Sequence, residues 1–363
     1  MDFKMINGNI KVIIKSMINV KITNPSLKYH SKKNLDIFNF TNEENNIYRN
    51  KKYWINENNS NIDYWFILED LNQRSETVNL KNNNLFFLSS ETSYSPDYYT
   101  KESKKNFLAQ FKNIYTPNYI FMENVVSNPP FLPWFLKKDH FIRNSEISEI
   151  ELLKNFSPKK ERLISVISSD KEMTEYQIAR KHFSHELKKH FGEKLDLFTN
   201  FNPMKKKERI APYKYHIVLE NQNRYNGFSE KLFDSFISSC FTIFGGSANI
   251  EDYFDRNSFI KININDFNGS INSIENAINN NMYENNLDSI RNSKNVVLNE
   301  FNLINRIDKI IDSHEANNQK SSYKNITVYE KRHFESTGSL GKLAFKVDSS
   351  LKKISNKLET YYI

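Results

Sequence analysis

The sequence contains little of what marks a secreted or membrane-spanning protein. Cys240 is the one cysteine among 363 residues, which excludes an internal disulfide framework and is typical of a reducing compartment. It lies on the apolar face of an expected helix, so we interpret it as a packed thiol and not as a nucleophile. No apolar run approaches the length of a transmembrane helix, and the first residues, M-D-F-K-M-I-N-G-N-I-K-V-I-I-K, lack the apolar centre of a signal peptide.

Motifs of several common enzyme and nucleic-acid-binding families are also missing. There is no G-x-x-x-x-G-K-[ST] phosphate loop, no G-x-S-x-G nucleophile elbow, and nothing that matches a zinc finger, an RNP motif or a basic zipper. His182 and His185 are three residues apart on an expected helix, but no further ligand accompanies them, and no D-x-D stands at a strand end. We therefore predict no metal site and no nucleic-acid partner.

What is present is a basic, aromatic-rich chain that is long enough for two domains. Hydrophobic residues make up 38% of the sequence and aromatic residues 14%, enough for a sizeable core, and the formal net charge is +8. A positive charge favours anionic partners, namely nucleic acid, an anionic membrane surface or phosphorylated ligands. Because nucleic-acid motifs are missing, we favour the phosphorylated ligand and the membrane surface.

The most regular stretch of the chain is residues 211–267. Alternation in Y-K-Y-H-I-V-L predicts a strand, which is followed by E-N, a polar loop and a helix with Ser229 as its N-cap. The apolar run F-T-I-F, ended by G-G-S, predicts the next strand. A strand, a crossover helix and a second strand make a βαβ unit, and such sheets bind ligands beyond the carboxyl ends of their strands.

Two pairs of polar residues fall at the junctions of this unit. Glu220 and Asn221 end the first strand, and Glu230 and Lys231 occupy the first turn of the helix. The N–H groups and positive dipole of a helix start favour an anion such as phosphate; Lys231 would add a full charge, and Glu230 could accept sugar hydroxyls. The alternative is that Glu230 is a carboxylate drawn to the helix dipole and Lys231 a solvated lysine.

The order of short motifs over this stretch favours the ligand-binding interpretation of these residues. L-E-N, F-S-E-K, G-G-S and S-F-I-K-I-N-I-N-D-F resemble the carboxyl-terminal signature of the family 10 glycosyltransferases, the α-1,3-fucosyltransferases, which reads roughly F-E-N, Y-V-T-E-K, G-S or G-P, S-F-I and D-F. The resemblance extends more weakly over residues 80–312. One position departs from the pattern, because the family's tyrosine before V-T-E-K falls on Gly227 or, with a one-residue shift, on Phe228, although Tyr225 is close.

The resemblance implies a fold, a donor substrate and a set of site residues. The fold would be α/β, with two Rossmann-like domains facing across a cleft in the GT-B arrangement. The reaction would be an inverting transfer of L-fucose from GDP-β-L-fucose to a saccharide, with no metal and no cofactor. Arg180, on a helix expected over residues 175–191, and Lys231 would bind the pyrophosphate, which suits an arginine fork and a lysine charge. The other donor-binding candidates are Glu220, Asn221, Tyr225, Phe228, Glu230, Gly246, Ser247 and Asn249.

The acceptor side is expected in the amino-terminal half. L-F-F-L-S-S-E-T resembles the family's strand and glutamate, which makes Glu91 the candidate general base. An inverting transfer needs a carboxylate that takes the proton of the attacking hydroxyl. The alternative is that Glu91 is an exposed loop acid. Trp134, in the proline-bounded loop S-N-P-P-F-L-P-W-F-L, could stack on a pyranose ring or plug the core.

Changes of pattern divide the chain into three parts. The polar break S-P-K-K-E-R separates an amino-terminal acceptor-side α/β domain, residues 1–157, from a nucleotide-sugar-binding Rossmann-like domain, residues 158–315. Within them we expect loops over 24–60, a polar connection over 71–84 and one apolar helix over 284–313. Residues 316–363 form a basic tail, with a helix expected over 340–358, that packs on the first domain or contacts a membrane.

These expectations describe a cytoplasmic enzyme, peripheral at the inner membrane face, whose acceptor is a free or lipid-linked saccharide. Two alternatives stay open. The same scaffold could use a different nucleotide-sugar donor. Alternatively, the chain could be a non-enzymatic protein that binds nucleic acid or membrane through its basic loop, residues 204–209, and its tail.

Overall fold

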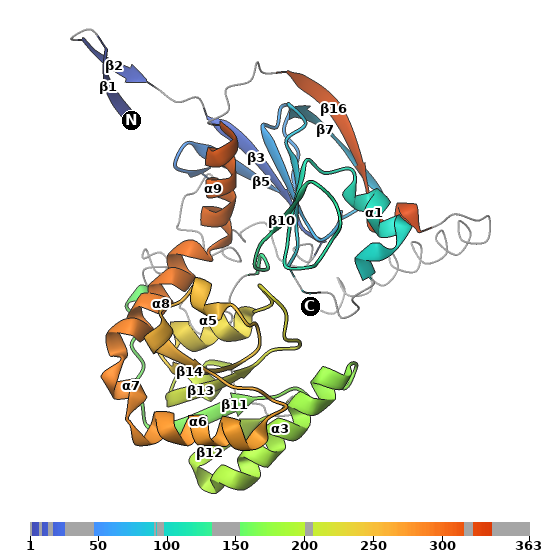
Figure 1. Ribbon diagram of the computed structural model, residues 1–363. Coiled ribbons are helices and arrows are strands. Elements are labelled where there is room, and N and C mark those ends of the chain that lie inside the picture. The colour runs from blue at the N-terminus through green and yellow to red at the C-terminus, as the bar shows by residue number, and fades with distance from the viewer. Residues whose placement is uncertain are drawn as a thin grey trace, which may run out of the picture.

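The computed structural model describes residues 2–6, 9–13, 17–25, 47–90, 92, 98–132, 153–199, 206–315 and 322–335 (Figure 1). Over these residues the chain is a mixed α/β structure with two main sheets, one of seven strands and one of five. A small antiparallel ribbon, made of β1 (Asp2–Ile6) and β2 (Asn9–Ile13), precedes them. The α/β class expected from the sequence is confirmed.

The five-stranded sheet is parallel throughout, as the βαβ pattern of the sequence predicted. Its strands lie in the order β12 (Leu195–Phe198), β11 (Arg162–Ile167), β13 (Tyr213–Leu219), β14 (Phe241–Gly245) and β15 (Phe259–Lys261). Neighbouring residues of β13 pack in different apolar clusters, Val218 in one and Ile217 and Leu219 in the other. Because side chains alternate along a strand, the two clusters lie on opposite faces of the sheet.

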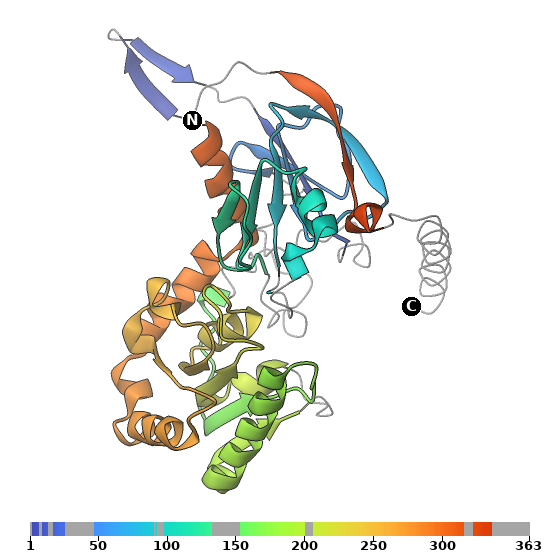
Figure 2. The ribbon, with the colours of Figure 1, turned by 45° about the vertical axis from the view of Figure 1, so that its right-hand side comes forward.

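Helices cover both faces of this sheet (Figures 1 and 2). α3 (Glu175–Phe191) has the predicted bounds and begins at Thr174, whose side chain accepts a hydrogen bond from the N–H of Gln177. α5 (Glu230–Ile237) begins at Ser229, the predicted N-cap. The other helices of this half are α4 (Lys206–Ile210), α6 (Phe267–Asn279), α7 (Met282–Asn285) and α8 (Leu287–Glu300).

The seven-stranded sheet forms the other half of the molecule. Its order is β10 (Val125–Ser127), β9 (Asn113–Thr116), β8 (Leu85–Leu88), β6 (Tyr64–Leu68), β3 (Ile18–Thr23), β5 (Lys51–Ile55) and β4 (Ile47–Tyr48). All of its pairings are parallel except that of β4 with β5. One face packs against α1 (Glu102–Leu108), through Phe107 and Leu108.

Two segments that were expected to lack strands contain them. β4 and β5 lie within residues 24–60, and β7 (Ser75–Lys81) lies within residues 71–84. In β7 only Val78 and Leu80 are buried, and the other positions are polar. A strand with so few apolar residues shows almost no alternation, so its sequence reads as a loop.

The prediction of a single helix over residues 284–313 is also wrong. α8 ends at Glu300 and α9 runs over Leu303–Glu315, because Asn302 starts a new helix: its side-chain oxygen accepts hydrogen bonds from the N–H groups of Ile304 and Asn305, at 3.0 and 3.3 Å. α9 then leaves the five-stranded half and packs its apolar face on the seven-stranded sheet (Figure 1).

The described part of the carboxyl-terminal tail adds a strand to the first half. β16 (Tyr323–Tyr329) pairs with β7 in antiparallel fashion, and the hydroxyls of Thr77 and Thr327 lie 2.8 Å apart. The helix expected over 340–358 lies outside the described residues. Within the described ranges, no helix is both long enough and apolar enough to cross a membrane.

A cluster of charges holds α9 against the edge of the seven-stranded sheet. The Lys51 ammonium lies 2.5 Å from Oδ1 of Asp308 and 2.8 Å from Oδ1 of Asp312, and Arg49 Nη1 lies 2.5 Å from Oδ2 of Asp308. The Lys51 and Asp308 side chains are each 2% exposed, whereas that of Asp312 is 57% exposed. A buried ammonium group needs its carboxylate partner to offset the loss of hydration.

Asp308→Ala should therefore destabilise the protein far more than Asp312→Ala. Removing Asp308 leaves the buried Lys51 with one exposed partner, and we expect the free energy of unfolding to fall by about 3 kcal/mol. Asp312→Ala removes only the exposed partner and should cost less than about 1 kcal/mol. Urea denaturation of both variants measures the difference, and equal losses would contradict this role of Asp308.

Candidate functional site

A pocket of about 300 Å³ lies where the carboxyl ends of β11 and β13 meet the seven-stranded half. We refer to it as the strand-end pocket. One wall comes from the first half of the chain and contains Thr92, Pro130 and Leu132. The other wall comes from the second half and contains Ser169, Lys171, Glu220, Asn221, Gln222, Gly227, Phe228, Ser229, Glu230 and Lys231. Residues that the sequence placed at strand and helix ends are thus brought together.

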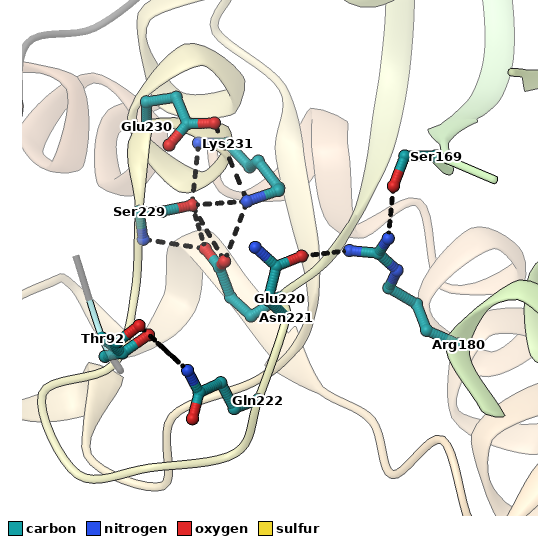
Figure 3. A network of polar contacts seen from close by, with 9 residues as sticks. All are labelled: Thr92, Ser169, Arg180, Glu220, Asn221, Gln222, Ser229, Glu230 and Lys231. Atoms are coloured by element: carbon teal, nitrogen blue, oxygen red, sulfur yellow. Dashed lines mark hydrogen bonds and ion pairs between the residues drawn. The ribbon is translucent and has the colours of Figure 1, made fainter. Parts of the chain in front are cut away.

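The Glu220 carboxylate joins the end of β13 to the start of α5 (Figure 3). The residue is 3% exposed. Its Oε1 accepts a hydrogen bond from the N–H of Ser229 at 2.8 Å, and the Ser229 hydroxyl lies 2.8 Å from both carboxylate oxygens. Its Oε2 is 3.2 Å from Nζ of Lys231. Glu220 therefore fixes the first turn of the helix and the lysine in that turn.

Lys231 brings a fixed positive charge to the pocket. Its ammonium donates to Oγ of Ser229 at 2.9 Å and lies 3.7 Å from Oε1 of Glu230, and its side chain is 25% exposed. Burial lowers the pKa of Lys231, but the carboxylates of Glu220 and Glu230 raise it by more, so the pKa lies above its ordinary value. The lysine is consequently charged at neutral pH, beside the N-terminus of α5, where an anion is favoured.

Arg180 stands behind the same wall. It lies on α3, is 2% exposed, and donates from Nη1 to Oδ1 of Asn221 and from Nη2 to Oγ of Ser169, both at 2.6 Å. Asn221 and Ser169 line the pocket, although Arg180 is not among its lining residues. The guanidinium group thus orients the Asn221 amide and adds a positive charge behind the pocket wall.

Of the other predicted donor-binding residues, Ser247, Asn249 and Tyr225 do not line the pocket, whereas Phe228 does. Ser247 and Asn249 are buried, and the Ser247 hydroxyl donates to Oδ1 of Asn249 at 2.7 Å. Tyr225 is 61% exposed, and its hydroxyl is 3.2 Å from Oδ2 of Asp252. Phe228 does contribute to the lining, but its ring is buried against aromatic neighbours, with Phe301 at 5.6 Å between ring centroids.

Gly246 matters for the shape of the site. A Cβ at this position would lie 2.6 Å from Cζ of Phe244 and 2.9 Å from Cγ of Glu220, both closer than normal contact. The glycine thus leaves the space that the Glu220 side chain occupies. Gly246 therefore contributes to the pocket because it has no side chain.

The candidates on the first-half side fall partly outside the described residues. Glu91 and Trp134 both do, so their predicted roles stay predictions. Their sequence neighbours are described: Thr92 lines the pocket, and the N–H of Ser90 donates to Oε1 of Glu69 at 2.6 Å.

Glu69 was not predicted as a site residue. It directly follows β6 and has a positive φ of 64°, a conformation that non-glycine residues seldom adopt, and its Oε2 is 3.1 Å from Nζ of Lys331. Burial raises the pKa of Glu69, but the Lys331 ammonium and hydrogen bonds from Ser90 and Ser89 lower it by more. Glu69 is thus an ionised anchor for the segment after β8.

Several residues that line the strand-end pocket were not predicted as site residues, among them Ser169, Lys171, Gln222 and Ser229. Ser169, Lys171 and Gln222 each lie within a few residues of a strand end, which is the signal that could have identified them. Ser229 was predicted only as a helix cap, and it also contacts Glu220 and Lys231. Across the described ranges, no three histidine, cysteine, aspartate or glutamate side chains gather in a way that could hold a metal ion.

Comparison with known proteins finds no matching family model and no matching curated protein. Among solved structures, a crystal structure of an α1,3-fucosyltransferase is 16% identical, covers 76% of this chain and 82% of its own, and has a TM-score of 0.45. One described as holding GDP is 15% identical, with 76% and 83% covered and a TM-score of 0.47. One described as holding GDP-fucose is 16% identical, with 76% and 83% covered and a TM-score of 0.45.

All three carry the name of the family whose signature the sequence resembles. At these identities and TM-scores the similarity is distant.

Ser229→Ala should cost more stability than a helix cap alone explains. Thr174→Ala is the matched control, because Thr174 caps α3 through one hydrogen bond, from the N–H of Gln177. We expect the control to lower the free energy of unfolding by about 1 kcal/mol, and Ser229→Ala by about 2–3 kcal/mol, since it also leaves Glu220 and Lys231 without their shared hydroxyl. Urea denaturation measures both. Equal losses would mean that Ser229 serves only as a cap.

Proposed function

We propose that the chain is an inverting glycosyltransferase that moves L-fucose from GDP-β-L-fucose to a hydroxyl of a saccharide acceptor, giving an α-1,3-type linkage. One observation carries the proposal. Glu220, Asn221, Glu230 and Lys231, which the family resemblance assigns to the donor, line one pocket at the carboxyl ends of parallel strands. Parallel α/β sheets bind nucleotides at this edge.

The charges of the pocket suit the leaving group of such a reaction. The acceptor oxygen bonds to the anomeric carbon of fucose while the bond from that carbon to the β-phosphate oxygen breaks, and GDP departs with additional negative charge. Lys231 at the start of α5, with Arg180 behind Asn221, would stabilise that charge through groups already held in place by Glu220 and Ser169. This role needs no metal.

The hydroxyl-binding roles follow from which atoms are already engaged. Both carboxylate oxygens of Glu220 contact Ser229, so Glu220 orients Lys231 more readily than it binds a sugar. Arg180 occupies the amide oxygen of Asn221, so a contact from Asn221 to a ribose or fucose hydroxyl would come from its Nδ2. Glu230 also lines the wall, with its Oε1 3.7 Å from Nζ of Lys231 and its side chain 20% exposed, and it would accept a sugar hydroxyl.

The proposal extends to the acceptor side and to the domains. Glu91, between Ser90 and the pocket-lining Thr92 in the chain, would accept the proton of the attacking hydroxyl. Trp134 would stack on the acceptor. The two sheets would form the GT-B pair of domains, divided near residue 157, with the tail after residue 315 completing the first. A basic chain acting on a saccharide, free or lipid-linked, suits a cytoplasmic enzyme at an anionic membrane face.

Lys231→Ala should weaken the binding of GDP by about 10- to 100-fold, the range of one charge-assisted contact. Lys261→Ala is the control, because Lys261 is an exposed lysine, paired with Glu251, that is not among the residues of the strand-end pocket. Isothermal titration calorimetry with EDTA present measures the affinities for GDP and UDP. Unchanged GDP affinity in the Lys231 variant would refute its phosphate role. If the wild type binds UDP more tightly than GDP, the donor would be a uridine nucleotide sugar, and the assignment of the fold would be unaffected.

Glu91→Gln should abolish transfer without affecting donor binding. We expect turnover with GDP-fucose and a saccharide acceptor to fall by about 10²- to 10⁴-fold, the usual contribution of a general base. The affinity for GDP should stay within about twofold of the wild type, because the amide keeps the size of the side chain. Glu123→Gln, at an exposed glutamate of the same half, is the matched control. Retained turnover in the Glu91 variant would remove it as the base.

A further inference from the structure

The loop between Glu220 and Ser229 connects the two walls of the strand-end pocket. Nε2 of Gln222 donates to Oγ1 of Thr92 at 2.8 Å and to its carbonyl oxygen at 3.2 Å (Figure 3). Further along the loop, Nδ2 of Asn226 donates to Oγ of Ser127 at 2.9 Å. Thr92 follows β8 and Ser127 ends β10, so a loop of the second half contacts the first half at two points.

The side chain of Asn226, within this loop, contacts both halves of the chain. It is 2% exposed and has a positive φ of 59°, a conformation that asparagine tolerates better than most residues. Its N–H donates to Oδ1 of Asn249 at 2.8 Å, and its Oδ1 accepts from Nδ2 of Asn249 at 2.8 Å and from the hydroxyl of Tyr253 at 2.6 Å. The amide oxygen therefore faces the second half of the chain, while the amide nitrogen faces the first.

The residues that follow Asn226 and those that follow Ser127 line opposite walls of the pocket. Gly227, Phe228 and Ser229, which follow Asn226, all line the pocket, and the N–H of Gly227 closes a tight turn onto the carbonyl of Arg224 at 2.9 Å. A displacement of Asn226 would move this part of the wall.

On the other side, the chain after Ser127 supplies Pro130 and Leu132 to the opposite wall. Arg306 of α9 fixes this segment: its guanidinium donates to the carbonyls of Pro129 and Pro130 at 2.5 and 2.6 Å and lies 3.6 Å from the ring centroid of Phe131. The Asn226–Ser127 hydrogen bond thus links the loop of the second half to a first-half segment that Arg306 of α9 also contacts.

We infer that Asn226 is a positioning residue that sets the donor wall of the pocket against the acceptor wall through its hydrogen bond to Ser127. The inference rests on the proposed function, in which donor and acceptor bind to opposite walls. Losing this bond would change the approach of the acceptor to the fucose. It would leave the contacts of GDP unchanged, because these lie on one wall.

Ser127→Ala tests the inference, since it deletes only the first-half partner of Asn226. We expect the affinity for GDP to stay within about twofold and kcat/KM for the acceptor to fall by about five- to tenfold, the effect of one neutral hydrogen bond. Ser127→Thr keeps the hydroxyl and should restore kcat/KM to within about twofold of the wild type. An acceptor kcat/KM in Ser127→Ala equal to that of the wild type, or a loss that Ser127→Thr does not restore, would overturn the inference.

A second measurement does not depend on activity. In the unliganded protein, hydrogen–deuterium exchange at the amides of residues 126–128, 131, 132 and 222–229 should be faster in Ser127→Ala than in Ser127→Thr, because the two segments lose their link. Thr327→Ala, which removes a hydroxyl pair between β7 and β16, should leave these amides unchanged. Equal exchange in all three variants would overturn the inference. Wild-type protein that fails to transfer fucose would count against the proposed function alone, since the exchange experiment still reports on the link.

Discussion

The buried Glu220 carboxylate is the constraint around which the site is arranged. A carboxylate that is 3% exposed needs hydrogen-bond donors around it, and here the N–H and hydroxyl of Ser229 and the ammonium of Lys231 supply them. One group thereby fixes where β13 ends, where α5 begins and where a positive charge stands. Even the glycine at position 246 follows from it, because a side chain there would occupy the space of Glu220.

The five-stranded half and the second-half wall of the pocket were largely predictable from the sequence. Their signals are local: alternation in β13, caps at Thr174 and Ser229, and polar residues placed just after strands. Glu220 and Lys231 are eleven residues apart, so the strand and helix that carry them already determine that they meet. Local periodicity could not show which way each side chain points. That is why Ser247 and Asn249 were grouped with the pocket residues, although they support Asn226 from behind.

The seven-stranded half was predicted less well, because its sheet depends on distant pairings. β7 has two buried apolar residues and acquires its place by pairing with β16, across about 250 residues of sequence. Asn302 caps α9 and so interrupts an apolar run that otherwise reads as one helix, and α9 then packs on the seven-stranded sheet. The role of Glu69 could likewise not be predicted, because only tertiary structure brings Ser90 and Lys331 beside it.

The route of the chain through the two halves has a consequence for how the protein forms during synthesis. The strands of the five-stranded sheet lie within residues 162–261, one uninterrupted stretch, so that sheet can form as soon as this stretch has left the ribosome. The seven-stranded half begins earlier but lacks α9 and β16 until residues 303–329 have been made. Its apolar face, including Val20, Phe66 and Phe86, stays uncovered by α9 while the second half is translated. The half that starts first is therefore completed last, and the finished second half carries α9 to it.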